Sequence, residues 1–379
     1  MQIILISIGT AIVLLALADI FLTVLHPRSD SSLLSIPVAR AVWWLFLRIA
    51  PLKKRRDRFL SYGGPTIIVT IVGVWVLLLL VGFALIVWPA LGTTIQVKEG
   101  KSPTDFFAAV YYVGFALTTL GTGDFTPQTS FQRLLLVLQG ILGYSVLTLT
   151  LSYVTSIYSN LTSRKSFALS LHHGTADTAN SAELLARLAA DNNINTLNQD
   201  ISETAQNLMQ LLESNKSYPV LLYFRYPQDY YALPRILYLT MDVATLVGSA
   251  LDQKKYRAII RSAGAAELWF GSKHLLEEIC HTLLPRVRVH SQELQESRWR
   301  KHYYQALERL KMEGISITDD PEAGVESYVS MRRQWAAHLE KLTKYMAYEP
   351  EQIFPNLSRT MMNDNSPTLF DPGNYPFKS

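Results

Sequence analysis

The chain has 379 residues, of which 49% are hydrophobic and 17% are charged, whereas an ordinary soluble domain has about 25% charged residues. This composition excludes a wholly disordered chain, a collagen-like chain and a disulfide scaffold. The single cysteine, Cys280, excludes an intrachain disulfide, a four-cysteine zinc site and a CxxC redox motif. The net charge of +4 averages two unlike halves, because residues 1–164 carry 12 Lys and Arg against 6 Asp and Glu, and residues 165–379 carry 23 against 25. Since the apolar half is the basic half, the pattern favours a membrane over nucleic acid as partner.

Three long apolar runs predict three membrane-spanning helices. They cover Ile3–Leu25, Thr66–Leu91 and Leu134–Tyr158, and each has 23 to 26 residues, whereas about 20 helical residues cross a hydrocarbon core. The first run lacks the basic start and the small-residue cleavage site of a signal peptide. Asp19 is the one charged residue in these runs. Such an acid is by default a functional hypothesis, but we favour a hydrogen bond to a neighbouring helix or access to the cytoplasmic interface.

The charges between the runs predict the orientation in the membrane. Segment 27–64 carries eight Lys and Arg against two Asp, whereas segment 92–103 carries two Lys against one Glu. Because cytoplasmic loops are enriched in basic residues, the first segment should be cytoplasmic and the second external. The N-terminus then lies outside, and the chain after the third run lies in the cytoplasm. Within the basic loop, Ile36–Ile49 mixes tryptophan and arginine with aliphatic residues, which predicts a helix lying in the membrane interface.

Beyond residue 165 the chain reads as a mainly helical domain that ends near residue 346. Helical periodicity covers five segments: 182–214, 233–263, 265–284, 291–313 and 322–346. The stretch Val220–Tyr226 predicts one strand, and the aromatic patch around it reads as domain core rather than as a ligand pocket. Residues 347–379 are rich in Pro, Asn, Ser and Asp and predict a loose tail.

Few residues of this domain are candidates for metal binding or catalysis. His274, Glu278 and His281 share one helix face, and His290 could add a fourth metal ligand. We favour a solvated polar face instead, because no second metal motif is present. Neither a G-x-G-x-x-G that opens a helix nor a G-x-S-x-G elbow occurs. We therefore expect no catalytic residues, no bound metal and no cofactor.

The segment Pro103–Phe131, between the second and third runs, carries the informative motif. Its first part, Thr104–Thr118, predicts a short aromatic helix that cannot span a bilayer. The sequence then reads Thr119-Leu120-Gly121-Thr122-Gly123-Asp124. Since both ends of the segment lie on one side, it must enter the membrane as a helix and return as extended backbone. Such backbone is tolerated only where protein buries it or water lines it, and its glycines permit positive φ angles.

The run Thr118–Asp124 resembles the TTVGYGD filter signature of tetrameric potassium channels. The flanks resemble the bacterial two-helix pore type, here with an additional N-terminal transmembrane helix, and the resemblance covers residues 65–160. It implies a homotetramer whose backbone carbonyls coordinate potassium, with the Thr119 hydroxyl forming the innermost site. By this resemblance the ion-coordinating residues are Thr119, Leu120, Gly121, Thr122 and Gly123. Thr118 and Asp124 would support the filter, and Gly143 would be the gating hinge.

Two positions depart from the family pattern. Leu120 replaces the usual valine, which is a mild change. Thr122 replaces a tyrosine whose ring, in the family, packs outward against the pore helix and holds the diameter of the filter. Tyr111 or Tyr112 could compensate. Two hypotheses therefore stay open: a potassium-selective pore, which we favour, and a pore that also passes sodium.

Together these observations predict an all-α membrane protein with a potassium-channel-like pore domain, a re-entrant pore loop and a mainly helical cytoplasmic domain. The expected parts are an N-terminal transmembrane helix (1–26), a basic cytoplasmic loop with an interfacial helix (27–64), the pore domain (65–160), the helical cytoplasmic domain (165–346) and the tail (347–379). The expected function is monovalent cation conduction across the cell membrane, plasma or inner, with K⁺ permeating. The expected partners are further copies of the chain, the lipid bilayer and an unknown cytoplasmic regulator. A membrane-anchored enzyme or a non-conducting sensor with a pore fold is the rival interpretation.

Overall fold

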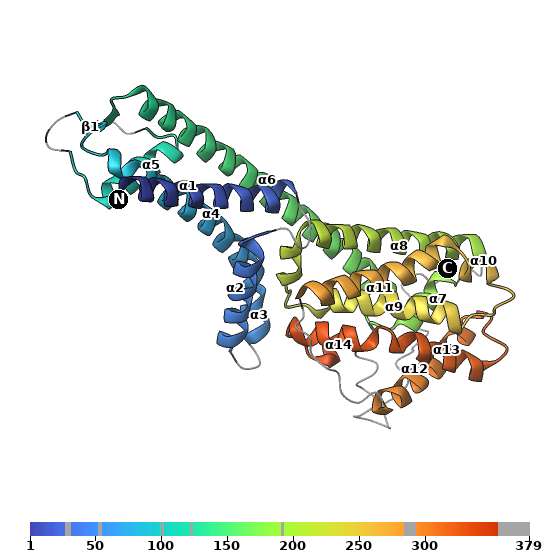
Figure 1. Ribbon diagram of the computed structural model, residues 1–379. Coiled ribbons are helices and arrows are strands. Elements are labelled where there is room, and N and C mark those ends of the chain that lie inside the picture. The colour runs from blue at the N-terminus through green and yellow to red at the C-terminus, as the bar shows by residue number, and fades with distance from the viewer. Residues whose placement is uncertain are drawn as a thin grey trace. The chain divides into compact units, whose positions relative to one another are not determined.

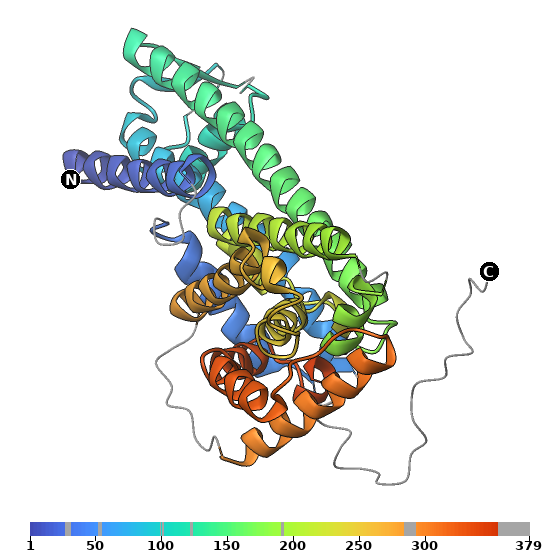
Figure 2. The same ribbon diagram turned by 90° about the vertical axis from the view of Figure 1, so that its right-hand side faces the viewer.

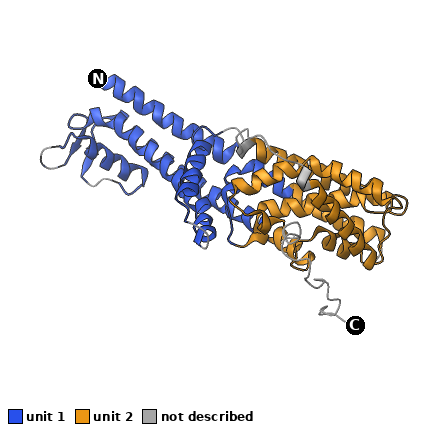
Figure 3. Ribbon diagram, turned by 90° about the horizontal axis from the view of Figure 1, so that it is seen from below, with its two compact units in different colours: residues 1–165, 210–227 blue, residues 166–209, 228–379 orange. Residues whose placement is uncertain are grey.

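The computed structural model describes residues 1–26, 32–51, 55–98, 100, 102–121, 124–190, 193–283 and 293–354. In these ranges the protein is mainly helical, and three helical stretches are long and apolar enough to cross a membrane: Gln2–Leu25, Arg56–Ala90 and Ser130–Gly174. They lie where the sequence predicts its three spans. The chain divides into two compact units (Figure 3). The first is formed by Met1–Lys165 with Gln210–Pro227, and the second by Ser166–Met209 with the chain from Gln228 onward.

The first unit contains the apolar helices and a small sheet. Its elements are α1 (Gln2–Ile20), the π-helical turn η1 (Phe21–Leu25), α2 (Ser35–Ile49), α3 (Arg56–Ser61), α4 (Gly63–Val87), the 3-10 turn η3 (Trp88–Ala90), β1 (Ile95–Val97), α5 (Phe106–Leu117), β2 (Phe125–Pro127) and most of α6 (Ser130–Gly174). Strands β1 and β2 pair antiparallel, with Gln96 opposite Thr126.

Small residues allow α1 to pack closely along α4 (Figure 1). A Cβ atom at Gly9 of α1 would lie 2.5 Å from the carbonyl oxygen of Gly82 of α4, and one at Gly82 would lie 2.8 Å from Val13. Within a membrane the hydrophobic effect does not drive helix association, so close backbone approach of this kind stabilises helix pairs through van der Waals contact. The two glycines therefore place α1 against α4.

Asp19 is fully buried near the end of α1 and forms hydrogen bonds to two other elements. Its carboxylate accepts from the Leu34 backbone N–H, the Ser35 hydroxyl and the Trp75 indole N–H of α4, each at 2.7 Å. The predicted hydrogen bond to a neighbouring helix is thereby confirmed. A buried acid is tolerated when its oxygens are satisfied in this way, so Asp19 ties α1 to α4 and to the start of α2.

The second unit is a set of packed helices. Its elements are the end of α6, α7 (Ser181–Leu188), the first part of α8 (Ile194–Ser217), the 3-10 turn η5 (Asp229–Tyr231), α9 (Leu233–Ser249), α10 (Arg257–Ile260), α11 (Ala263–Leu283), α12 (Glu293–Met312), α13 (Pro321–Arg333), α14 (Ala336–Tyr345) and α15 (Pro350–Ile353). Helix α9 is buried along almost its whole length and lies among α7, α11, α13 and α14 (Figure 2).

A buried charge network crosses the centre of this unit. Asp242 of α9 has no exposed surface and accepts hydrogen bonds from Tyr328 at 2.6 Å, from Arg332 and from Ser181, and His302 Nε2 lies 3.0 Å from it. Burial alone would raise the pKa of Asp242, but the Arg332 guanidinium and the hydrogen bonds from His302 and Ser181 hold that pKa below its usual range. The carboxylate is therefore charged at neutral pH, and the network joins α7, α9, α12 and α13.

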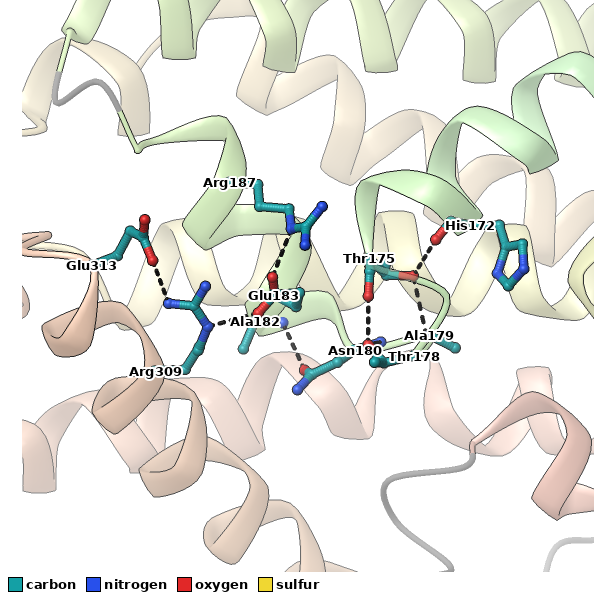
Figure 4. A network of polar contacts seen from close by, with 10 residues as sticks. All are labelled: His172, Thr175, Thr178, Ala179, Asn180, Ala182, Glu183, Arg187, Arg309 and Glu313. Atoms are coloured by element: carbon teal, nitrogen blue, oxygen red, sulfur yellow. Dashed lines mark hydrogen bonds and ion pairs between the residues drawn. The ribbon is translucent and has the colours of Figure 1, made fainter. Parts of the chain in front are cut away.

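A second polar network joins α7 to α12 in the same unit (Figure 4). Glu183 accepts from Arg187 and from Arg309, each at 2.6 Å, and Arg309 also donates to Glu313 at 2.6 Å. The turn that joins α6 to α7 is held by Thr175, whose hydroxyl donates to the His172 carbonyl at 2.7 Å and accepts from the Ala179 backbone N–H at 3.1 Å. These bonds fix the path of the chain as it leaves α6.

The structure differs from the sequence prediction in the region after residue 209. Residues 210–227 belong to the first unit rather than to the helical domain predicted over 165–346. The strand predicted at Val220–Tyr226 is wrong, because Pro219–Tyr223 forms the 3-10 turn η4. Its proline starts the turn, and the Phe224 N–H bonds to the Leu221 carbonyl within the same turn rather than to a neighbouring strand.

The segment predicted as a loose tail begins with an ordered helix. In α15 the side chain of Ile353 is buried, and the Phe354 ring packs edge-on against Tyr238 with centroids 5.1 Å apart. Two apolar residues thus dock this short helix where its polar composition predicts a loop. Residues 355–379 lie outside the described part of the chain.

Breaking the central network is expected to destabilise the second unit. Arg332→Met leaves Asp242 buried without its cationic partner, and removal of one member of a buried ion pair costs about 3–5 kcal/mol. Urea unfolding of the detergent-solubilised protein, followed by tryptophan fluorescence, measures this loss. Arg300→Met is the matched control, because Arg300 pairs with Glu326 at the surface and should leave the midpoint nearly unchanged. Equal midpoints for the two variants would contradict a structural role for the network.

Candidate functional site

The candidate site begins with the short helix α5, which lies in the chain between α4 and α6. Asp105 caps its start, because the carboxylate accepts from the Ala108 backbone N–H at 3.0 Å. Its 12 residues extend about 18 Å, well short of the ~30 Å hydrocarbon core. One face of α5 is buried and contacts α4; the buried residues are Ala109, Tyr112, Val113 and Ala116.

At the C-terminal end of α5 the backbone becomes irregular. The Thr118 hydroxyl donates to the Gly114 carbonyl at 2.7 Å, which closes the last helical turn. Thr119 and Gly121 then both adopt positive φ angles, 61° and 75°. A threonine in this region is strained, and such strain concentrates at functional sites. Thr122 and Gly123, also predicted to coordinate the ion, lie outside the described residues.

Beyond the filter motif, the chain is fixed to the loop that precedes α5. The Asp124 carbonyl accepts from the Lys98 N–H at 3.0 Å, and the Asp124 carboxylate accepts from the N–H of Phe125 at 3.1 Å. Strand β2 follows at once and pairs with β1. The Arg133 side chain donates to the Pro127 carbonyl at 3.2 Å, which ties this turn to the start of α6. The chain after the filter motif is thus held to the preceding loop by the Lys98 bond and the strand pairing, and to α6 by Arg133.

An aromatic cluster joins the chain after the filter motif to α5. The Phe125 ring is 4% exposed and packs against Tyr111 and Tyr112 of α5, with centroid distances of 6.1 and 6.0 Å. Tyr111 also packs against Phe115 at 4.7 Å. The two tyrosines could be identified from the sequence, but Phe125 could not, because nothing in the motif indicates that a residue after the filter turns back toward the helix before it.

Gly143 lies where α6 passes the end of α5. A Cβ atom at this position would lie 1.9 Å from the Leu117 carbonyl oxygen, which no packing adjustment of a side chain can relieve. Only glycine permits this approach of the two backbones. The structure therefore gives Gly143 a packing role, and its role as a gating hinge stays a prediction.

The other candidate residues do not gather into a site. His274 and Glu278 are 3.8 Å apart on α11, and no group of three or more His, Cys, Asp or Glu among the described residues could hold a metal ion. His290 lies outside those residues. His172 belongs to the end of α6 and stacks on Tyr230 with ring centroids 4.5 Å apart.

Substituting Gly143 is expected to destabilise the first unit. Gly143→Ala forces α5 and α6 apart, and overpacking of this kind costs about 1–3 kcal/mol. Thermal melting in detergent measures the loss. Gly73→Ala on α4 is the matched control, because a Cβ there meets nothing within 4 Å; it should be neutral or slightly stabilising. An equal effect of the two substitutions would show that the Gly143 contact is unimportant.

Comparison with known proteins addresses the same region. A family model described as "Ion channel" matches residues 70–160, from within α4 through α5 into α6. An uncharacterized membrane protein, YdjJ of Bacillus subtilis (strain 168), is 25% identical over 144 residues, which is 37% of this chain and 42% of that protein. The chain thus spans less than half the length of this curated relative. No solved structure matches the chain.

These matches agree with the three apolar helices in indicating a membrane protein, and they point to ion transport rather than catalysis. They also agree with the resemblance that the filter motif indicates. Residues 70–160 of this chain, which run from α4 through α5 into α6, are therefore similar to an ion channel domain.

Proposed function

We propose that this protein is a potassium-conducting channel in which four copies of the chain surround one pore. The observation that carries the proposal is the alternation of left-handed residues, Thr119 and Gly121, directly after the short helix α5. Such alternation turns successive carbonyl oxygens toward one side of an extended strand. Four strands of this kind would form rings of oxygen atoms that replace the hydration shell of a monovalent cation.

The surroundings of the strand fit a cation. The C-terminal end of α5 carries a negative partial charge and lies immediately before Thr119. Thr118, Thr119, Leu120 and Gly121 are all exposed in the single chain, and Leu120 is an exposed large apolar residue. One chain supplies one strand, so closing the ring requires further copies related by cyclic symmetry.

Selectivity for potassium is the finer part of the proposal. Thr122 occupies the position where the resembling family has a tyrosine, so the ring that braces the filter there is missing. The cluster of Phe125 with Tyr111 and Tyr112 supports an alternative brace, because it packs the chain after the filter against the helix before it. A braced filter favours potassium over a pore that passes sodium as well.

The proposal also includes the orientation of the chain in the membrane and the regulation of the pore by the second unit. The excess of basic residues in segment 27–64 supports a cytoplasmic location for α2 and α3. The N-terminus is then outside, the second unit is cytoplasmic, and a regulator bound there would bias the pore only if it binds the open and closed states differently. The rival function is a sensor that keeps the pore fold without conducting.

Ion flux into liposomes tests the channel. Purified protein should carry K⁺ down its gradient, and Gly121→Ala should reduce the flux to background, because φ is +75° at this position and a Cβ there is strained. Gly73→Ala should conduct normally. Absence of K⁺ flux from the unmodified protein, at any voltage or pH, would favour the non-conducting sensor.

The reversal potential under opposed K⁺ and Na⁺ gradients tests selectivity. We expect a value close to the potassium equilibrium potential for the unmodified protein and a shift toward zero for Phe125→Leu, since the smaller side chain loses its contacts with both tyrosines. Phe107→Leu is the control, because Phe107 lies on the exposed face of α5 and is 81% exposed. A reversal potential near zero for the unmodified protein would establish the non-selective alternative.

A further inference from the structure

Residues 210–227 leave the second unit, pack within the first and return, and residues 218–226 are the part of this excursion that follows α8. Helix α8 begins in the second unit and ends in the first, the turn η4 follows, and the chain re-enters the second unit at Gln228. The segment is apolar and buried where it packs: Val220, Leu221, Leu222, Tyr223 and Phe224 are all at most 5% exposed. The excursion is continuous with the second unit at both ends. A movement of the second unit can therefore displace it.

The segment holds α6 close to the point where that helix leaves the first unit. The Arg164 side chain is 3% exposed and donates to two carbonyls of the segment, those of Leu221 at 3.1 Å and Phe224 at 3.0 Å. The Phe224 ring packs edge-on against Tyr158, with centroids 6.3 Å apart. One turn earlier in α8, the Ser214 hydroxyl donates to Asn160 at 2.6 Å. About two turns of α6, from Tyr158 to Arg164, are therefore held by this excursion.

The same segment also holds the start of α4. Arg225 is 1% exposed and donates to the Asp57 carboxylate of α3 at 2.6 Å and to the Asp57 carbonyl at 3.3 Å. The Phe224 ring lies so close to Gly64 that a Cβ atom there would be 2.7 Å from it. Tyr223 packs against Trp43 of α2 at 6.0 Å. The segment is thus a bridge between residues 158–164 of α6 and the elements that precede the body of α4.

We propose that residues 218–226 are a coupling segment, which sets the position of residues 158–164 of α6 and transmits the state of the second unit to them. The inference rests on the proposed function and adds that α6, the helix that follows the filter motif in the chain, lines the pore. Arg164, Arg225 and Asp57 are its positioning residues. A change in the second unit that moves either end of the excursion must move the carbonyls that hold Arg164, and this part of α6 moves with them.

Single-channel recording with a double-mutant cycle tests the coupling segment. Asp57→Asn and Arg225→Gln should each change the ratio of open to closed times by roughly fivefold or more, the scale typical of coupling between sites. Unitary conductance and reversal potential should stay unchanged, because the filter is untouched. The double variant should behave as Arg225→Gln does, since Arg225 makes both of the bonds to Asp57 and Asp57→Asn weakens only the one to the carboxylate. Arg58→Gln, an exposed arginine on the same helix, should have no effect.

Transmission from the second unit is tested with Tyr328→Phe, which removes one hydrogen bond from Asp242. It should change the open-to-closed ratio when Arg225 is present and have no effect in the Arg225→Gln background. The same effect in both backgrounds would overturn transmission through the segment. Unchanged open times in Asp57→Asn and Arg225→Gln, or altered conductance instead, would overturn the positioning role.

Hydrogen exchange separates failure of the coupling segment from failure of the channel proposal. In detergent, the amides of residues 158–165 should exchange faster in Asp57→Asn and Arg225→Gln than in the unmodified protein or Arg58→Gln. This readout does not require conduction. If the unmodified protein carries no current, the proposed function fails, and unchanged exchange over 158–165 would then overturn the coupling segment independently.

Discussion

The first unit depends on one constraint: a backbone that is not helical cannot lie against lipid, because its polar groups would remain unsatisfied there. Residues 118–121 leave helical geometry between two membrane-spanning helices. Their surroundings are arranged accordingly. Helix α5 packs on α4, the pairing of β1 with β2 holds the returning chain, and Gly143 lets α6 approach the Leu117 carbonyl. The remaining exposed side of these residues is the side on which the proposed ring of copies closes.

The parts of this arrangement that depend on local sequence could be predicted. Length and apolarity define the three spans, and the short aromatic run before the glycines defines α5. The contacts that brace the site could not be predicted, because they depend on close approach between distant segments. Phe125 follows the filter motif by a single residue, yet its role depends on a strand pairing that returns it to Tyr112. The approach of Gly143 to Leu117 is likewise a property of two backbones.

In the region after residue 165, the helices could be predicted from the sequence but their tertiary arrangement could not. These helices could be recognised from their periodicity, but the division into units could not, because the contacts of residues 210–227 with the first unit join segments that are distant in the chain. Buried charged residues hold these segments together, and their burial could not be predicted from the sequence. Arg164, Arg225 and the Asp242 network are charged residues that composition places at the surface, and each is buried with hydrogen-bonding partners. Their partners are distant in the chain, so pattern alone could not identify them.

These contacts constrain how the proposed channel opens. Helix α6 is one uninterrupted helix over Ser130–Gly174, and it is fixed at two places: Gly143 against Leu117, and Arg164 against the carbonyls of Leu221 and Phe224. The part of α6 near Arg164 can therefore move only if the helix bends between the two contacts or if one of the contacts shifts. The first contact is between backbones and admits no adjustment. The second depends on a segment continuous with the second unit, so that unit can act on α6 through this contact as well as through the end of α6 itself.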